Sequence, residues 1–269
     1  MREQTAQFAT YLDNLERVRV FVQQFMENAH LSEEQIYNVQ ISVDEHFVNL
    51  VEHAFEGNSP HHITISCQED DQKAQVVVLD SSKGFDPRNS SIPDVEGTSI
   101  SELSPGGFGN YFITKLMDKV EYIHRPYEKN ELILTMYKHN PTQHEPDRQK
   151  EEVHMDVQIR HSEQQEDVHI VEVEGRIAAD TAPEVEAALK SLLEQDCVKI
   201  IVDFANVSYI SSGGLRVFLT ALKQARAKNG DVKLVNLIPN VEKIFKLAGF
   251  TKIFTIMNDM ESALNAFAS

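Results

Sequence analysis

Apolar and polar residues recur along the first half of the chain with two different periods, and the period predicts where helices and strands lie. Helices are expected at residues 7–28, 32–55 and 110–117, and strands at 63–67, 75–80, 119–123 and 131–137. A loop-rich segment separates the strand that ends at Asp80 from the glycines near Gly107. The pattern predicts a layer of helices on a sheet.

The second half alternates strand-like and helical segments. Strands are expected at 168–173, 199–204 and 232–237, and helices at 182–193, 214–228, 241–247 and 260–267. This alternation is typical of an α/β domain. Between the halves, residues 139–153 contain two prolines and many charged residues, which is typical of a linker. We therefore expect a first domain at 1–140, a linker at 141–153 and a second domain at 154–269.

The helix expected at 32–55 has two faces. Ser32 and Gln35 have the spacing of a capping box, in which each side chain satisfies an amide at the helix start. The apolar stripe expected to pack on a sheet consists of Ile36, Val39, Val43, Phe47, Leu50 and Ala54. Glu45 and Asn49 lie opposite, on the outward face and one turn apart, so they can converge on one ligand. Any amphipathic helix carries polar residues there, so the pair alone has little weight.

Two later segments could complete a site around that helix. Asp80 ends an apolar strand, where its carboxylate can accept a hydrogen bond from an exocyclic amine, and Gly84 lets the backbone approach a flat ring. Gly106, Gly107 and Gly109 precede or open a helix, whose free amides and dipole favour phosphate groups. Taken singly, Asp80 could be a turn former and the glycines a flexible turn.

The order of these motifs resembles the GHKL ATPase superfamily, and within it the anti-sigma-factor serine kinases, over residues 5–138. The segments most similar to that branch are 43–45, 49–55 and 116–118. Three motifs in order are far more specific than any one of them. The chain departs from the family at Ser82, where a glycine is usual.

The resemblance implies a protein kinase that uses ATP and Mg²⁺. Glu45 is expected to be the general base that takes the proton of the acceptor serine, and Asn49 is expected to hold the Mg²⁺ ion. Asp80 is expected to bind the adenine amine. The glycines are expected to contact the nucleotide, with Gly84 lining the adenine pocket and Gly106, Gly107 and Gly109 forming the lid hinge and the phosphate contact.

Several histidines raise the alternative of a metal site. His46 and His53 are seven residues apart on the expected helix, and His61 and His62 follow soon after. No glutamate or cysteine completes a familiar zinc spacing. Loop histidines and a partly buried His53 are the favoured interpretation.

A serine in the second half stands at the expected start of a helix. Ser212 follows an apolar strand and precedes two glycines, and serine is a favoured N-cap residue that needs no further function. The surrounding pattern, however, resembles the STAS domain of anti-sigma-factor antagonists over residues 155–268. The matching segments are 173–177, 202–207, 209–216 and 248–250. The resemblance implies that Ser212 is the regulatory phosphoacceptor, although relatives often have aspartate at Ser211 and serine at Gly213.

Composition narrows the class of protein. The 269 residues are 41% hydrophobic and contain no apolar run long enough to span a membrane, so two soluble domains are expected. Cys67 and Cys197 lack metal-type spacing and no leader segment opens the chain, which favours the cytoplasm and reduced thiols. A net charge of −17 argues against direct nucleic-acid binding. The acidic surface could steer a basic partner or simply maintain solubility.

Together the two resemblances predict an ATP-dependent serine kinase in a partner-switching pathway. Its substrate would be Ser212 or a serine of a separate STAS antagonist, and a sigma factor and a second copy of the chain are its expected partners. One alternative is a non-catalytic module, in which ATP orders the lid and the STAS half docks a partner. A weaker alternative is an ATPase that uses water as the acceptor.

Overall fold

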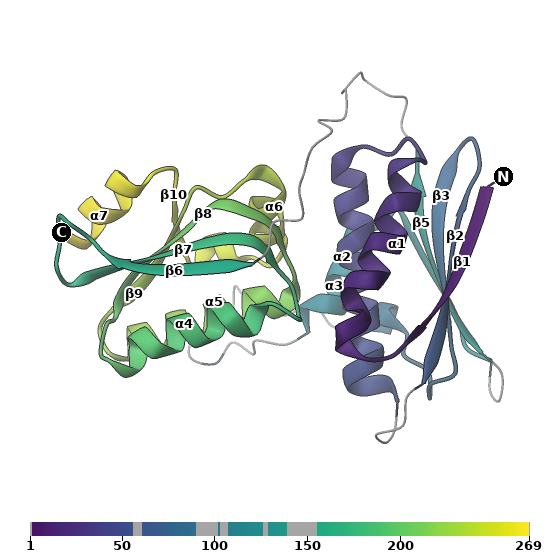
Figure 1. Cartoon of the computed structure of the whole chain (residues 1–269), viewed down its shortest axis with the longest axis horizontal. Coiled ribbons are helices and arrows are strands. Elements are labelled where there is room, and N and C mark those ends of the chain that lie inside the picture. The colour runs from purple at the N-terminus through teal and green to yellow at the C-terminus, as the bar shows by residue number, and fades with distance from the viewer. Residues whose placement is uncertain are drawn as a thin grey trace. The chain divides into compact units, whose positions relative to one another are not determined.

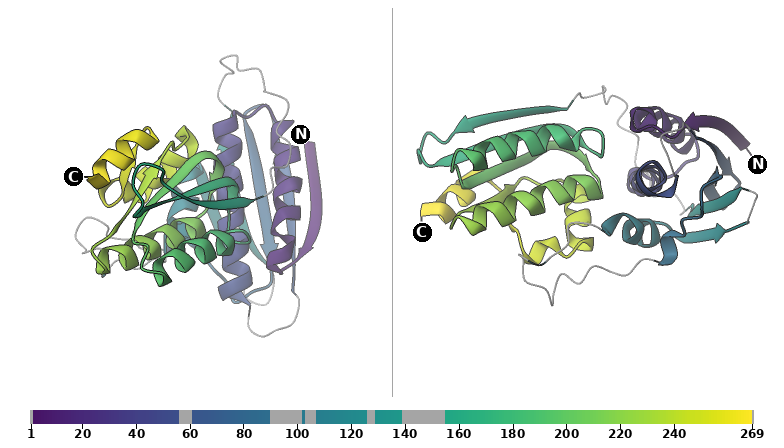
Figure 2. Two further views of the ribbon diagram at one scale, coloured as in Figure 1. Left: turned by 60° about the vertical axis from the view of Figure 1, so that its left-hand side comes forward. Right: turned by 90° about the horizontal axis from the view of Figure 1, so that it is seen from below.

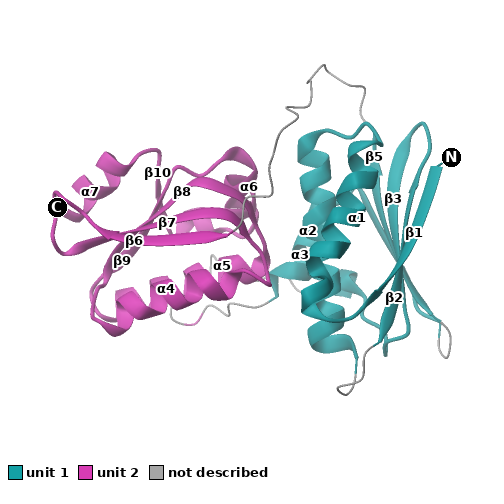
Figure 3. Ribbon diagram, viewed as in Figure 1, with its two compact units in different colours: residues 1–92, 107–147 teal, residues 93–106, 148–269 magenta. Residues whose placement is uncertain are grey.

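The computed structural model describes residues 2–55, 61–89, 102, 107–125, 129–138 and 155–268. Contacts between Cα atoms divide the chain into two compact units (Figure 3). The described residues up to position 89 belong to the first unit together with residues 107–138, and residues 155–268 belong to the second. The linker expected at 141–153 lies outside the described residues, and each unit is considered by itself.

The first unit is an antiparallel sheet with helices on one face (Figure 1). Its strands are β1 (Arg2–Ala9), β2 (His62–Glu69), β3 (Lys73–Asp80), β4 (Lys119–Ile123) and β5 (Asn130–Tyr137), in the order β1-β2-β3-β5-β4. Its helices are α1 (Leu15–Glu27), α2 (Glu33–Asn49) and α3 (Phe108–Leu116), with short helical turns η1 (Leu12–Asn14), η2 (Leu50–Ala54) and η3 (Pro87–Asn89). This arrangement confirms the expected layer of helices on a sheet.

The start of the chain differs from the helix expected at residues 7–28. Residues 2–9 form β1, which pairs antiparallel with β2 at the edge of the sheet, and α1 begins only at Leu15. β1 is largely exposed, but Phe8 is buried and its ring packs edge-on against Phe21 of α1, 5.7 Å away. Residues 2–9 are extended because they pair with β2, which lies more than fifty residues later in the chain. The local spacing of apolar residues gives no information on such a distant partner.

Helix α2 is the central element of the first unit. The expected capping box is present, with Gln35 N donating to Ser32 Oγ at 3.2 Å and Ser32 N donating to Gln35 Oε1 at 3.1 Å. Every residue from Tyr37 to Phe47 is buried. The polar side of the helix is therefore not the outward face that amphipathic patterning predicts. Helices α1 and α3 both pack against α2.

An ion pair fixes α2 against α1. Arg19 Nε donates to Asp44 Oδ2 at 2.7 Å, and both side chains are only 3% exposed. Arg19 also pairs with Glu16, one turn earlier on α1, at 3.0 Å. Because Asp44 directly precedes Glu45, this contact sets the rotation of α2 about its own axis at the position of the expected general base.

The second unit is a mixed sheet with helices packed on it (Figures 1 and 2). Its strands are β6 (Asp156–His161), β7 (Val168–Ile177), β8 (Lys199–Ile210), β9 (Asp231–Val235) and β10 (Thr255–Met257), in the order β10-β9-β8-β7-β6. Its helices are α4 (Ala182–Glu194), α5 (Ser212–Ala227), α6 (Pro239–Leu247) and α7 (Met260–Ala268), with a turn η4 (Phe250–Lys252). β6 is antiparallel to β7, and the other neighbours are parallel. The expected α/β pattern is confirmed, and sequence patterning missed the edge strands β6 and β10.

None of the helices in the described part of the chain combines the length and the apolar character that crossing a bilayer requires.

Replacing Arg19 by methionine should lower the free energy of unfolding of the first unit by about 3–5 kcal/mol, because the variant leaves the Asp44 charge buried without its partner. Arg17 supplies the matched control. It lies two residues earlier on α1 and bonds Asn14 at the surface, so Arg17→Met should change stability by less than about 0.5 kcal/mol. Urea unfolding measures both, and equal effects of the two substitutions would contradict the role assigned to the buried pair.

Candidate functional site

Asp80 ends β3 with one carboxylate oxygen bound and the other available. The side chain is 1% exposed. Its Oδ1 accepts hydrogen bonds from Ser82 N at 2.8 Å and from Asn130 Nδ2 at 3.0 Å. Within the described residues its Oδ2 is buried and has no hydrogen-bond partner. A buried acceptor of this kind is costly unless a donor binds it, and an exocyclic amine of a bound base would fit.

The turn after β3 needs glycine at position 84. Gly84 has a φ of +95°, and a Cβ added there would lie 2.8 Å from His124 Nδ1. Its amide donates to Ser82 Oγ at 3.2 Å, and the next amide, of Phe85, donates to Tyr122 Oη at 2.8 Å. Ser82 is not among the described residues with positive φ, so its backbone does not require the glycine that is usual in the family.

An ion pair holds the continuation of this turn. Arg88 binds the Asp86 carboxylate with two nitrogens, Nε at 2.9 Å and Nη2 at 2.8 Å, and its Nη2 also donates to the carbonyl of Tyr122 at 3.3 Å. The hydrogen bonds from Arg88 hold the pKa of Asp86 below its usual value. Burial raises the pKa of the Tyr122 hydroxyl, and the nearby charges of Asp80 and Asp86 add to the increase. The turn that contains Gly84 is thus tied to β4 by both its backbone and its side chains.

The second group of expected residues lies where α2 ends and α3 begins. Glu45 is 5% exposed and Asn49 is partly exposed. Asn49 Nδ2 donates to Asn110 Oδ1 on α3 at 3.0 Å, which leaves the side-chain oxygen of Asn49 as the atom suited to a cation. Gly107 is the N-cap of α3 with a φ of +93°, and Gly109 lies in the first turn. Gly106 lies outside the described residues.

Two asparagines of the site were not recognised from the sequence. Asn110 immediately follows the last glycine of the expected motif, in the first turn of the helix expected to bind phosphate. That position in the sequence could have identified it as a site residue. Asn130 faces Asp80 across the β3–β5 pairing, and its amide bonds Ser82 O at 3.0 Å as well as the Asp80 carboxylate. That role depends on strand register, which the sequence does not display.

The expectation of a partly buried His53 was wrong. His53 is exposed, with 60% of its side chain accessible and Glu52 at 3.6 Å, whereas His46 is buried with 1% accessible. Residues seven apart share a face only while the helix remains α-helical, and η2 is a π-helical turn that changes the rotation before His53. No group of three metal-ligating side chains occurs in the described part of the chain, so the metal interpretation gains no support.

In the second unit, the residue that caps α5 is not the expected phosphoacceptor Ser212 but the serine before it. Ser211 is the N-cap of α5, is 5% exposed, and accepts a hydrogen bond from Gly214 N at 3.3 Å. Ser212 is the first helical residue and is partly exposed. The alternative in which Ser212 serves only as the cap is therefore wrong. Gly214 is needed for packing, because a Cβ there would lie 2.7 Å from Ile177 Cγ2.

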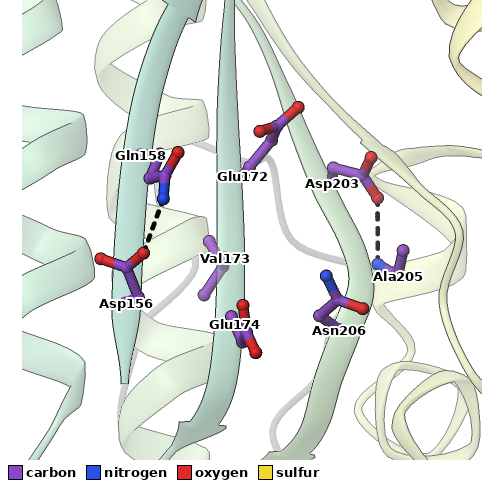
Figure 4. A pocket seen from close by; sticks show the side chains of 8 residues that line it. All are labelled: Asp156, Gln158, Glu172, Val173, Glu174, Asp203, Ala205 and Asn206. Atoms are coloured by element: carbon purple, nitrogen blue, oxygen red, sulfur yellow. Dashed lines mark hydrogen bonds between the residues drawn. The ribbon is translucent and has the colours of Figure 1, made fainter. Parts of the chain in front are cut away.

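A shallow hollow of about 260 Å³ lies on the sheet of the second unit, over β6, β7 and β8 (Figure 4). It is lined by Asp156, Gln158, Glu172, Val173, Glu174, Asp203, Ala205 and Asn206. Glu172 pairs with Arg160 at 2.7 Å, and Asp203 accepts hydrogen bonds from Ala205 N and Asn236 Nδ2, each at 2.9 Å. Its acidic lining lies apart from Ser212 in the sequence, and it was not recognised as a site from the sequence.

The buried His46 should give the first unit a measurable acid sensitivity. Burial lowers the pKa of His46 from 6.5 to about 4, and the charge of Asp80 opposes that change only in part. As the pH falls from 6.5 to 4, the unfolded chain takes up a proton that the folded chain cannot, so stability is lost across this window. The full effect is of order 3 kcal/mol, at about 1.4 kcal/mol for each unit of pKa difference.

Urea unfolding across the same window tests this prediction. His46→Leu should reduce the loss of stability, and His53→Leu, at the exposed histidine, should retain it. Identical pH dependence in the two variants would contradict the assigned ionisation.

Each of the two units is similar to a known protein family. The family model described as a histidine kinase-like ATPase domain matches residues 8–138, and the STAS domain model matches residues 160–263. The serine-protein kinase RsbW of Listeria innocua is 32% identical over 112 residues, which are 40% of this chain and 70% of that protein.

Antagonist proteins are similar to the remaining part of the chain. The anti-sigma-B factor antagonist of Listeria monocytogenes is 32% identical over 111 residues, 41% of this chain and 96% of that protein. BtrV of Bordetella bronchiseptica, a proposed anti-sigma factor antagonist, is 35% identical over 95 residues, 35% of this chain and 82% of that protein. The chain therefore belongs to the anti-sigma kinase family of histidine kinase-like ATPases in its first half and to the STAS anti-sigma factor antagonists in its second.

Proposed function

We propose that the first unit is an ATP-dependent protein serine kinase that phosphorylates a serine of a STAS domain, either Ser212 or the corresponding serine of a separate antagonist protein. The observation that carries the proposal is that one Asp80 oxygen is buried without a hydrogen-bond partner among the described residues, beside the turn that only glycine at position 84 allows. An amine donor of a bound base would remove the cost of that burial. The output of the phosphorylation is control of a sigma-factor-type regulator.

The residues present suit ATP and Mg²⁺. Asp80 would accept from the adenine amine, and Gly84 would leave room for the ring. The side-chain oxygen of Asn49 would hold the cation, and the start of α3 at Gly107 and Gly109 would direct amides and the positive end of the helix dipole towards phosphate. When bound, ATP with Mg²⁺ supplies the phosphoryl group and neutralises part of its charge.

Glu45 is the residue proposed to handle the proton. It lies one turn before Asn49 on α2, and the Arg19–Asp44 pair at the preceding residue fixes that part of the helix. A carboxylate at this position would take the proton of the serine hydroxyl as its oxygen attacks phosphorus. A positioned base of this kind contributes a factor on the order of 10²–10⁴ to the rate.

Ser212 is suited to receive a phosphoryl group without unfolding α5. Because Ser211 already caps the helix, the Ser212 hydroxyl is not required for that purpose. The first turn of α5 contains no acidic residue, and the positive end of the helix dipole would favour the roughly −1.5 to −2 charges of a phosphate. Arg216 is exposed one turn further along, where a side chain at i+4 can reach it. Phosphorylation is therefore proposed to act by changing how a partner docks.

The names of the relatives support this partner-switching role. One relative of the first unit is called a serine-protein kinase, and relatives of the second unit are called anti-sigma factor antagonists. We therefore take a STAS antagonist and a sigma factor as the proposed partners, with the protein acting in the cytoplasm, where ATP is available. Pairing with a second copy of the chain remains an expectation from the resemblance.

Glu45→Gln should lower the rate of serine phosphorylation by a factor on the order of 10²–10⁴ while ADP affinity stays within about twofold, because the amide cannot take a proton but retains the shape of the side chain. Glu52→Gln provides the control, since Glu52 follows on η2 and is 43% exposed. Phosphate transfer from labelled ATP and calorimetric ADP binding give the two readouts. An unchanged signalling output in the Glu45 variant would favour the non-catalytic docking module.

Incubation of the full chain with Mg²⁺ and ATP should add one phosphoryl group at Ser212, seen by intact mass and located by peptide mapping. Ser212→Ala should abolish this addition, and Ser208→Ala, at an exposed serine of the same unit, should not. A rate that rises with protein concentration would indicate transfer between copies. Steady release of phosphate with no label on this chain or on an added STAS antagonist would contradict the kinase proposal and favour the ATPase alternative.

A further inference from the structure

His46 is a buried titratable side chain that the proposed kinase chemistry does not use. It lies on α2 next to Glu45 and is 1% exposed. Neither of its ring nitrogens has a hydrogen-bond partner within the described part of the chain. Burying polar atoms without partners is unfavourable, and most buried polar atoms in native proteins are satisfied. An apolar residue would serve the packing of α2 better, so the imidazole requires another explanation.

A second unsatisfied group is electrostatically linked to this ring. Asp80 Oδ2 is buried and also lacks a partner among the described residues, although Oδ1 of the same carboxylate accepts two hydrogen bonds. The charge of Asp80 acts on His46 and raises its pKa against the effect of burial. No hydrogen bond joins the two side chains in the described structure. The Asp80 carboxylate on β3 and the His46 imidazole on α2 thus interact electrostatically without forming a hydrogen bond to each other.

The chemistry of these two groups defines what could satisfy both. Burial keeps His46 neutral near pH 7, because its pKa is lowered to about 4, and a neutral imidazole has one N–H donor and one acceptor nitrogen. The Asp80 carboxylate only accepts. A matching ligand therefore offers a donor to Asp80 and an acceptor beside it to His46. The edge of adenine has this arrangement, since its amine lies next to ring nitrogen acceptors.

Guanine does not match in the same way. Its O6 stands where adenine has the amine, and N7 beside it is also an acceptor. In the same orientation this oxygen would face the Asp80 carboxylate, and two acceptors would be left opposed in a buried site.

We propose that His46 determines base specificity in the nucleotide site, with one ring N–H donating to the adenine ring nitrogen next to the amine that Asp80 binds. The inference rests on the proposed function, because it requires an adenine nucleotide in the site. It adds a contact from α2 to the contact from β3, so the base is read from two elements. It also explains why a histidine occupies a position where the fold alone would favour an apolar side chain.

Calorimetric binding of ADP and GDP tests the assignment. His46→Leu should weaken ADP binding about 3- to 10-fold, the size expected for one neutral hydrogen bond, and should lower the preference for ADP over GDP by a similar factor. His46→Gln retains a donor and should lose less. His53→Leu changes the exposed histidine seven residues later and should bind as the wild type does.

The ring itself provides an independent readout. ADP should shift the ¹⁵N resonance of one His46 ring nitrogen at constant pH, and His53 should show no such shift. His46→Leu should be at least as stable as the wild type at neutral pH, because it removes unsatisfied polar atoms. If His46→Leu fails to fold, ADP binding by His46→Gln and the ¹⁵N resonances of His46 test whether the ring contacts the base.

The possible results distinguish the proposed kinase function from the proposed role of His46. A wild-type chain that binds no ADP overturns the proposed kinase function itself. A wild-type chain that binds ADP, while His46→Leu keeps the same ADP affinity and the same preference over GDP, overturns only the role of His46. A His46 resonance that ignores ADP has the same consequence.

Discussion

The complete burial of α2 is the constraint on which the first unit depends. A helix on the surface of a sheet normally turns one side to solvent, but here α1 and α3 flank α2 and every residue from Tyr37 to Phe47 is buried. Polar side chains in that stretch therefore need a hydrogen-bond or ion-pair partner, either from the protein or from a bound ligand. Asp44 illustrates the first case through its bond to Arg19 at 2.7 Å, and His46 illustrates the second.

This burial gives consecutive residues of one helix different duties. Asp44 anchors the helix to α1, and Glu45 is placed by that anchor. His46 is linked to the end of β3 through the charge of Asp80. Asn49, at the end of the helix, is tied to the first turn of α3 by its bond to Asn110 at 3.0 Å. The rotation of α2 about its axis thus sets the positions of the proposed base, the imidazole ring and the proposed cation ligand together, which suits a reaction that depends mainly on positioning.

In the second unit, the helix cap and the proposed phosphoacceptor are neighbouring serines. Ser211 caps α5, and Gly214 allows the helix to approach Ile177. A modification at Ser212 can then alter charge at the surface while the cap stays intact. A partner that docks on this end of α5 would register the change.

Local patterns in the sequence were sufficient for most elements and for both family resemblances. The capping box at Ser32, the strand end at Asp80 and the glycines around α3 are signals carried by neighbouring residues. Features that depend on distant contacts could not be read in this way. β1 forms because β2 lies beside it, Asn130 reaches Asp80 through strand register, and a π-helical turn separates the environments of His46 and His53. Only the packing of the described residues shows that the His46 ring on α2 lacks a hydrogen-bond partner.

The most direct test is a crystal structure of the chain with Mg²⁺ and a non-hydrolysable ATP analogue. The account predicts the adenine amine within hydrogen-bond distance of Asp80 Oδ2, a ring nitrogen of the base at His46, and the cation on the side-chain oxygen of Asn49. A nucleotide bound elsewhere, or a base that leaves Asp80 Oδ2 without a donor, would contradict it.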